Sequence, residues 1–321
     1  MKNFTRNLTL ALCGTFAAVT AQADSDFPNK PVRIIVPFAA GGSSDNLTRV
    51  LAEQLTKDWK QPVIIDNKSG ANGSIGASLV SKSAPDGYTI YLAPVSIGTV
   101  NLFIKKPGFD VEKDLIPVTL LARGDYVLNV NKDVPVNTIA ELADYSRKNP
   151  GKLFHGSFGG ASWLAFEQLS ESLNFNVTNV NYRGEAPALT ALMGGEIQVM
   201  FSTLASARPF IETKKIKALG LTSKNRSTIA PDIKSADESG AKGFYVDFWF
   251  GLMVPAGTPP EIVKKINAGA AAALNRPDIK GRLFGMGLNA SPSTPAEFGE
   301  LVKFESERWV NTAKRIGLEP Q

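Results

Sequence analysis

Two side-chain types that carry much of enzyme and metal chemistry are nearly missing from this chain of 321 residues, which has one cysteine and one histidine. The cysteine, Cys13, lies in an N-terminal segment that we expect to be removed. The mature chain would then have no disulfide, no thiolate nucleophile and no cysteine metal site. A metal site that used His155, the single histidine, would have to be rich in carboxylates. We therefore expect no metal and no cofactor.

Long hydrophobic runs are also scarce. The one extended apolar run, residues 8–19, follows Lys2 and Arg6 and precedes Ala21-Gln22-Ala23. This order is typical of a secretory signal peptide. The run is too short to be a permanent membrane anchor, and no later run approaches the length of a span. We expect residues 1–23 to be a signal peptide, cleaved after Ala23, and the rest of the chain to be exported.

Positive charge is in small excess. Of the formal charge of +5, two units belong to Lys2 and Arg6, which leaves +3 for the expected mature chain. A nucleic-acid partner usually needs a dense basic face, and these charges are few and scattered. The composition therefore excludes nucleic acid and leaves a mild bias towards small anionic partners.

Short strands and helices alternate along the chain. A β-branched run over residues 32–36 precedes a glycine pair and a helical pattern over residues 45–59. The same order restarts with a strand at residues 152–155, a glycine-rich turn, and a helical pattern over residues 162–173. This alternation predicts an α/β protein with two similar halves, each a mostly parallel sheet flanked by helices. Ligands of such sheets bind at the carboxyl ends of the strands.

Three helix starts carry the same signal. Thr138, Thr258 and Thr294 are each followed three positions later by a glutamate. This spacing is typical of a capping box, in which the threonine oxygen and the glutamate each accept a backbone amide. We interpret these motifs as structural.

The glycine-rich turns between strands and helices are the most informative motifs. Gly41-Gly42-Ser43-Ser44 stands in the first half and residues 156–162 in the second, with residues 92–96 and 182–185 at comparable positions. A helix that begins at such a turn presents unpaired amides and a partial positive charge. Glycine lets a ligand approach the backbone, and serine adds donors, so the turns suit a carboxylate or phosphate. Alternatively, each is a plain turn, and Asp45 caps its helix.

An enzyme is the rival interpretation. A hydrolase with a Ser-His-Asp triad would have to use His155, and Ser157 lies only two residues away without a Gly-x-Ser-x-Gly motif. No pair of nucleophile and base is supported. Neither the dinucleotide fingerprint nor a P-loop lysine pattern occurs. We expect a binding protein, with an exported hydrolase as the alternative.

An ordered set of motifs resembles the Bug-type solute receptors, the extracytoplasmic binding proteins of tripartite tricarboxylate transporters. The set covers nearly the whole mature chain. It comprises residues 28–38 with Gly41-Gly42 and Asp45, residues 70–76, residues 85–89, Gly156-Ser157 with Gly160, residues 182–188, residues 194–196, and Trp249 with residues 255–259.

This resemblance implies a two-lobed periplasmic-binding-protein fold of the Venus flytrap type. Residues 24–124 and 248–321 would form lobe 1, and residues 125–247 lobe 2, with crossings near residues 123–127 and 247–251. The protein would be a periplasmic monomer that captures a small carboxylate between its lobes. It would deliver this ligand to membrane permease subunits, or report it to a sensor domain.

The resemblance also implies how the ligand is held. Backbone amides and hydroxyls from loops of both lobes would bind its carboxylate. Carried over to this chain, the expected ligand-binding residues are Phe38, Ala40, Gly42, Ser43 and Ser96 from lobe 1, and Ser157, Gly160, Ser162, Tyr182 and Gly184 from lobe 2.

Departures from the family pattern leave the identity of the carboxylate open. Trp163 stands where relatives often have histidine, as either a stacking wall for the ligand or a core residue. Gln198 stands where an acid is usual, which weakens recognition of an amino-acid ammonium there. Glu185 could supply such a contact, or could simply start its helix.

Overall fold

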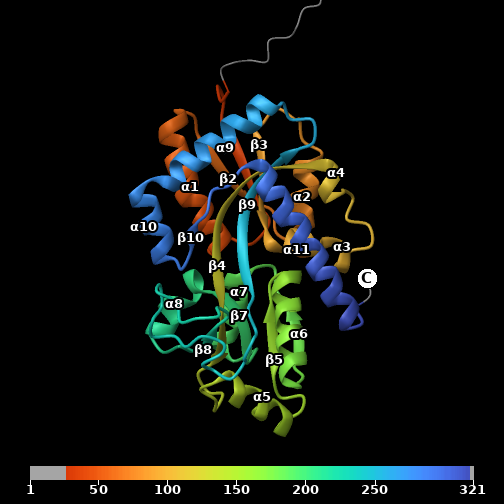
Figure 1. Ribbon diagram of the computed structural model, residues 1–321, viewed down its shortest axis with the longest axis vertical. Coiled ribbons are helices and arrows are strands. Elements are labelled where there is room, and N and C mark those ends of the chain that lie inside the picture. Colours follow the sequence, from red (N-terminus) through yellow and green to blue (C-terminus); the bar gives the residue numbers. More distant parts are fainter. Residues whose placement is uncertain (1–26, 319–321) are drawn as a thin grey trace, which may run out of the picture.

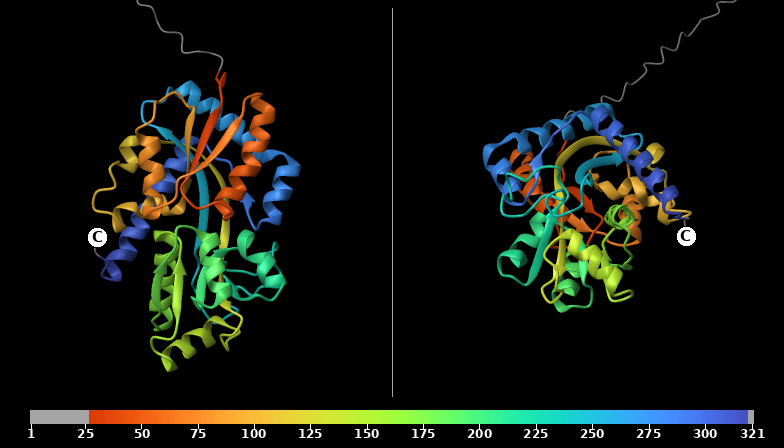
Figure 2. Two further views of the ribbon diagram at one scale, coloured as in Figure 1. Left: turned by 180° about the vertical axis from the view of Figure 1, so that it is seen from behind. Right: turned by 60° about the horizontal axis from the view of Figure 1, so that its bottom comes forward.

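The computed structural model describes residues 27–318, so the expected signal peptide and its cleavage after Ala23 lie outside the described residues. Figure 1 shows two lobes, one above the other, joined by two long strands. These strands are β4 (Leu115–Asn131) and β9 (Asp247–Pro255). The view from behind in Figure 2 shows the same strands running from one lobe into the other.

Lobe 1, the upper lobe of Figure 1, is built on three parallel strands in the order β2 (Val63–Asn67), β1 (Val32–Val36), β3 (Thr89–Pro94). Strand β9 pairs antiparallel with β3, and short β10 (Asn289–Ala290) pairs antiparallel with β4. Helices and 3₁₀ segments complete the lobe: α1 (Ser43–Trp59), η1 (Ala71–Gly73), α2 (Ser74–Ser81), η2 (Val95–Thr99), α3 (Val100–Phe103), α4 (Val111–Asp114), α9 (Pro260–Asn275), α10 (Pro277–Gly285) and α11 (Pro295–Arg315).

Lobe 2 repeats the arrangement on a smaller scale. Strand β5 (Phe154–Ser157) lies parallel to β6 (Thr178–Asn181) and β7 (Val199–Thr203), while β7 and β8 (Ile216–Leu221) pair antiparallel with β4. Its helices are α5 (Ile139–Lys148), α6 (Gly160–Leu173), α7 (Glu185–Gly194) and α8 (Leu204–Glu212). The two-lobed α/β fold expected from the sequence is confirmed.

Strand β4 changes partners along its length. It pairs with β9 as far as Asp125, and its pairing with β7 begins at Tyr126. Helix α11 makes a further link, because Gln168 of α6 donates to the Thr312 hydroxyl at 2.7 Å and Arg315 pairs with Glu171 at 2.8 Å. The lobe boundaries after residues 124 and 247 remain our prediction.

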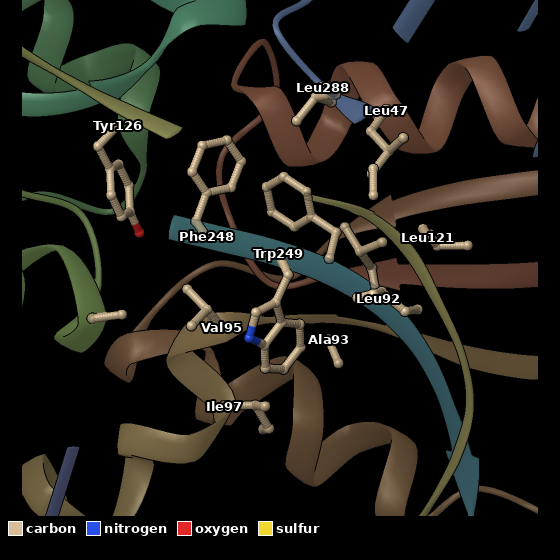
Figure 3. Close-up of a cluster of buried hydrophobic side chains, with 14 of the residues drawn as sticks. Leu47, Leu92, Ala93, Val95, Ile97, Leu121, Tyr126, Phe248, Trp249 and Leu288 are labelled. Atoms are coloured by element: carbon tan, nitrogen blue, oxygen red, sulfur yellow. The ribbon is translucent and has the colours of Figure 1, made fainter. Parts of the chain in front are cut away.

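The strands that join the lobes pass through the hydrophobic core. Figure 3 shows Trp249 and Phe248 of β9 among apolar side chains that include Leu92 and Val95. Trp249 is fully buried and meets the ring of Phe298 edge-on at 5.3 Å. Burial of such large apolar surfaces fixes the course of β9 between the lobes. Among the helices of residues 27–318, none combines the length and the apolar character that a membrane crossing requires.

The predicted capping boxes have three different outcomes. Thr294 forms the complete box at the start of α11. Thr138 forms half of the box: its hydroxyl accepts a hydrogen bond from the amide of Glu141. The carboxylate of Glu141 accepts the amide of Asn137 instead of the amide of Thr138. The prediction at Thr258 is wrong, because its hydroxyl donates to the carbonyl of Pro255 and α9 begins at Pro260 without a side-chain cap.

Candidate ligand-binding site

A cavity lies where the strand-to-helix turns of the two lobes meet. We call it the interlobe cavity. Its lining comes from both lobes and from β9: Phe38, Gly42, Ser43, Ser44, Pro94, Val95, Ser96, Tyr126, Phe158, Gly159, Ala161, Ser162, Glu185, Thr203, Phe248 and Phe250.

The two lobes touch beside this cavity. The amide of Ala39 in lobe 1 donates to the carbonyl of Arg183 in lobe 2 at 3.4 Å. The rings of Phe38 and Phe158 meet edge-on across the cleft, with centroids 6.4 Å apart. The structure is therefore a closed arrangement of the lobes.

Two helices begin at the cavity without side-chain caps. Gly42 precedes α1 and Gly159 precedes α6, and neither can supply a capping oxygen. The first amides of a helix have no intrahelical acceptor, and the helix dipole adds partial positive charge there. The glycine-rich turns predicted from the sequence thus face the cavity from opposite lobes.

Ser96 has a buried hydroxyl with no hydrogen-bond partner among the described residues. Its side chain is 3% exposed and lines the cavity at the end of β3. Leaving a buried hydroxyl unsatisfied costs on the order of 1–3 kcal/mol. This donor is therefore available to an occupant of the cavity.

The hydroxyl of Ser162, in contrast, already has two partners. It accepts the amide of Phe158 at 3.1 Å and donates to the carbonyl of Gly159 at 2.9 Å. These bonds fold the turn that precedes α6. Ser162 consequently shapes the cavity wall through the turn.

Glu185 places a buried carboxylate between the lobes. It accepts hydrogen bonds from the amide of Ser43 at 3.2 Å and the hydroxyl of Ser206 at 2.8 Å, and from the amide of Thr203. Ser43 is the first residue of α1, Glu185 the first of α7, and Thr203 precedes α8. The carboxylate thus lies at a helix start, as one of our two hypotheses held, and also crosses the cleft to lobe 1.

The rest of the wall is largely aromatic. Phe38, Phe158, Phe248 and Phe250 line the cavity, and Tyr126 adds its ring from β4. The ring centroids of Tyr126 and Phe248 are 5.0 Å apart. Figure 3 labels both side chains. Burial, followed by the Glu185 and Asp247 carboxylates, raises the pKa of the Tyr126 hydroxyl above its ordinary value. This hydroxyl therefore stays protonated.

The ten expected ligand-binding residues separate into groups. Five line the interlobe cavity: Phe38, Gly42, Ser43, Ser96 and Ser162. Ser157 and Gly160 line a second, more polar cavity, and Tyr182 lines a third. Gly184 packs against the backbone of Ala39, and Ala40 is exposed. Ligand binding by all ten stays a prediction.

Several lining residues were not expected from the sequence. Phe158 and Gly159 lie inside a glycine-rich turn that the sequence indicated, so their position at the site could have been predicted. Tyr126, Phe248 and Phe250 come from β4 and β9, where only closeness to the predicted crossings could have pointed to them. Thr203 was also missed. It lies beside Glu185, which the sequence had suggested as a contact, because its amide donates to the Glu185 carboxylate.

Trp163 and Gln198, which depart from the family pattern, lie outside the interlobe cavity. Trp163 is half-buried, donates to Glu167 at 2.7 Å and lies 5.0 Å from the ring of Phe103. It lines the second cavity. The side chain of Gln198 accepts a hydrogen bond from the amide of Phe154 and donates one to the carbonyl of Gly195, so it stabilises the turn that begins at Gly195.

His155 is part of the core of lobe 2. Its ring is fully buried, stacks on Phe166 at 3.8 Å, and is hydrogen-bonded through Nδ1 to Asn179 at 3.1 Å. Burial lowers its pKa to about 3. Ser157 directs its hydroxyl to Asn181 instead of to His155. Within residues 27–318, no three His, Cys, Asp or Glu side chains gather closely enough to hold a metal ion.

Comparisons with known proteins identify relatives. The profile of the tripartite tricarboxylate transporter family receptor matches residues 47–318. The structure of the periplasmic binding protein BugD has a TM-score of 0.88 at 34% identity, over 92% of this chain and all of that one.

Two further similar structures contain carboxylates. A protein of R. palustris with adipate has a TM-score of 0.89 at 32% identity, over 92% of this chain and 100% of that one. MatC from Rhodopseudomonas palustris, with bound malate, has a TM-score of 0.84 at 32% identity, over 89% of this chain and 99% of that one. This chain therefore belongs to the receptor family of tripartite tricarboxylate transporters, as its resemblance to Bug-type receptors predicted.

Proposed function

We propose that this protein is a periplasmic solute-binding receptor, without enzyme activity, that captures a small carboxylate in the interlobe cavity. The unpartnered hydroxyl of Ser96, buried in that cavity, is the observation that carries the proposal. The uncapped start of α6 faces the same space, whereas the first amide of α1 is already bonded to Glu185. Amides and hydroxyls so placed suit the oxygens of a carboxylate.

The relatives support this chemistry. Two solved family members contain adipate and malate, and both are similar to this chain over most of its length. The family description names a receptor of a transporter. We therefore assign capture for transport, with delivery to membrane permease subunits, or to a sensor domain in their place, as the step that follows closure.

Closure is the proposed mechanism. A ligand that contacts both lobes binds the closed arrangement better than an open one, and so shifts the equilibrium between them. Exclusion of water then strengthens each bond from an amide to the carboxylate, because the dielectric constant falls. The contact between Ala39 and Arg183 forms only when the lobes meet, so it adds to the stability of the closed arrangement.

A thermal-shift screen of organic acids, followed by calorimetry, tests the proposal. We expect at least one small carboxylate to raise the melting temperature and to be recovered unchanged by NMR. Ser96→Ala should raise its Kd roughly tenfold or more, because a charge-assisted hydrogen bond is lost. Ser172→Ala is the matched control, since its exposed hydroxyl bonds within α6 at Leu169, outside the cavity. Consumption of the acid, or equal affinity in both variants, would contradict the proposal.

A further inference from the structure

Glu185 is a buried carboxylate without a cation. It is 3% exposed, and among residues 27–318 no lysine, arginine or histidine forms an ion pair with it. In place of a counter-ion, the carboxylate is stabilised by neutral donors, which are the amides of Ser43 and Thr203 and the hydroxyl of Ser206, and by the starts of α1, α7 and α8. Helix starts stabilise a negative charge in this way.

The protein itself therefore supplies the anion at the α1 end of the interlobe cavity. The amide of Ser43, which the sequence suggested as a ligand donor, is already bonded to Glu185. The hydroxyl of Ser96 and the start of α6 after Gly159 remain as donors to a carboxylate. The hydroxyls of Ser43, Ser44 and Tyr126 also line the cavity, but they are uncharged and cannot balance the charge of a second carboxylate.

Among the described residues, the lining of the interlobe cavity contains no lysine, arginine or histidine that could balance a second carboxylate, and Glu185 is its one charged residue. Much of the remaining wall is apolar, formed by Val95 and the rings of Phe38, Phe158, Phe248 and Phe250. The more polar second cavity shares Gly159 with the interlobe cavity, and its lining within residues 27–318 likewise contains no lysine, arginine or histidine. Two like charges about 7 Å apart, at an effective dielectric constant of about 20, weaken binding roughly 50-fold.

From this geometry we infer that the ligand is a monocarboxylate with an uncharged, largely apolar body, and that Glu185 excludes dicarboxylates. The inference rests on the proposed function, because it assumes that the interlobe cavity is the carboxylate site. It assigns Glu185 a role in specificity: its charge repels the far carboxylate of a diacid and leaves an apolar end unaffected.

Three acids with six carbons test the inference, since they differ only in the far end. Hexanoate ends in a methyl group, adipate in a second carboxylate and 6-aminohexanoate in an ammonium. By calorimetry at pH 7.5, we expect the wild-type protein to bind hexanoate roughly 50-fold more tightly than adipate. A preference for adipate would overturn the inference and leave the proposed function intact. Tightest binding of 6-aminohexanoate would also overturn it, because Glu185 would then recognise a cation. Binding of none of these acids, nor of any in the organic-acid screen, would overturn the proposed function itself.

Variants then assign the preference to Glu185. Glu185→Gln keeps the size of the side chain without its charge, and should reduce the preference for hexanoate to about fivefold or less. Glu185→Ala vacates three helix starts, so the second carboxylate of adipate can occupy them and the preference should reverse. Glu212→Gln, at an exposed position of α8, controls for the loss of one negative charge and should keep the wild-type preference.

Folding is checked by the thermal unfolding midpoint of each variant. If Glu185→Ala does not fold, the affinities of Glu185→Gln and of the wild-type protein for hexanoate and adipate still test the role of Glu185. An unchanged preference in folded Glu185→Gln would show that Glu185 only holds the lobes together.

Discussion

Buried polar side chains in this protein differ in how completely they are hydrogen-bonded, and the difference separates structural residues from candidate ligand contacts. Glu185 has three partners, whereas Ser96 has none among the described residues. The sequence indicated Ser96, because a serine directly after a strand lies at the carboxyl edge of its sheet. The partners of Glu185 were beyond prediction, since Ser43 is 142 positions away and only tertiary packing brings them together.

His155 makes the chain sensitive to acid. Its pKa is about 3 in the folded protein, against an ordinary value near 6.5. Between these two pH values the histidine is protonated in the unfolded chain and neutral in the folded protein. The stability that depends on neutral His155 is complete above about pH 6.5 and is lost as the pH falls towards 3.

Replacing this histidine should remove the sensitivity. His155→Phe keeps a ring to stack on Phe166 and has no group that titrates there. Between pH 7 and 4.5 the free energy of unfolding of the wild type should therefore fall by on the order of 2 kcal/mol more than that of the variant. Urea unfolding at the two pH values measures the difference. Parallel losses in both proteins would mean that other groups cause the acid sensitivity.

At the scale of helices and turns, the sequence placed the start of α2 at Ser74 correctly but placed the starts of α1 and α6 too late. Helices α1 and α6 begin at Ser43 and Gly160, two residues before the predicted starts. The reason is that the helical conformation begins directly after Gly42, which is extended, and after Gly159, whose φ of +157° favours glycine, whereas serine was expected to lie in the turn. Which turns face each other depends on strand order and lobe closure, and neither can be derived from local patterns.

The start of α7 at Gly184 is a point of close approach between lobes. A Cβ there would lie 3.0 Å from the nitrogen and 3.1 Å from the Cβ of Ala39 in lobe 1. Gly184→Ala can relieve this contact by parting the lobes, so we expect roughly tenfold weaker ligand binding through a smaller closed population. Calorimetry gives the affinity, and small-angle scattering the radius of gyration.

Helix α7 carries its own control. A methyl group added to Gly194, at the other end of this helix, would meet no atom of the described residues within 4 Å. Gly194→Ala should therefore bind as the wild type does. Equal affinity for the Gly184 and Gly194 variants would show that closure does not bring the lobes this near in solution.

At the scale of the molecule, resemblance and alternation predicted two lobes, and the comparisons with BugD and the adipate complex confirm that fold. The aromatic wall of the cavity was missed, because Tyr126, Phe248 and Phe250 belong to strands whose pattern only indicates burial. Their role in the cavity follows from β4 and β9 crossing between the lobes, which a local pattern does not show.

Those two strands also carry paired acids at the place where β4 changes sheets. Asp125 is the last residue of β4 that pairs with β9, and it lies opposite Asp247. Arg123 pairs with Asp247 at 3.5 Å and leaves Asp125 without an ion pair of its own among residues 27–318. Burial, and then the neighbouring Asp247 carboxylate, raises the pKa of Asp125 to about 6.

The whole protein should therefore lose stability at this junction as the pH rises. Because the folded pKa of Asp125 lies above its unfolded value near 3.9, its contribution is complete below about pH 4 and is lost as the pH rises through 6. Asp125→Asn removes the charge, so its unfolding free energy relative to the wild type should rise by on the order of 2 kcal/mol between pH 4 and 7.5. Urea unfolding at both pH values measures this, with Asp133→Asn, an exposed position further along the chain, as the control. A constant difference between Asp125→Asn and the wild type at the two pH values would mean that Asp125 ionises as freely in the folded protein as in the unfolded chain.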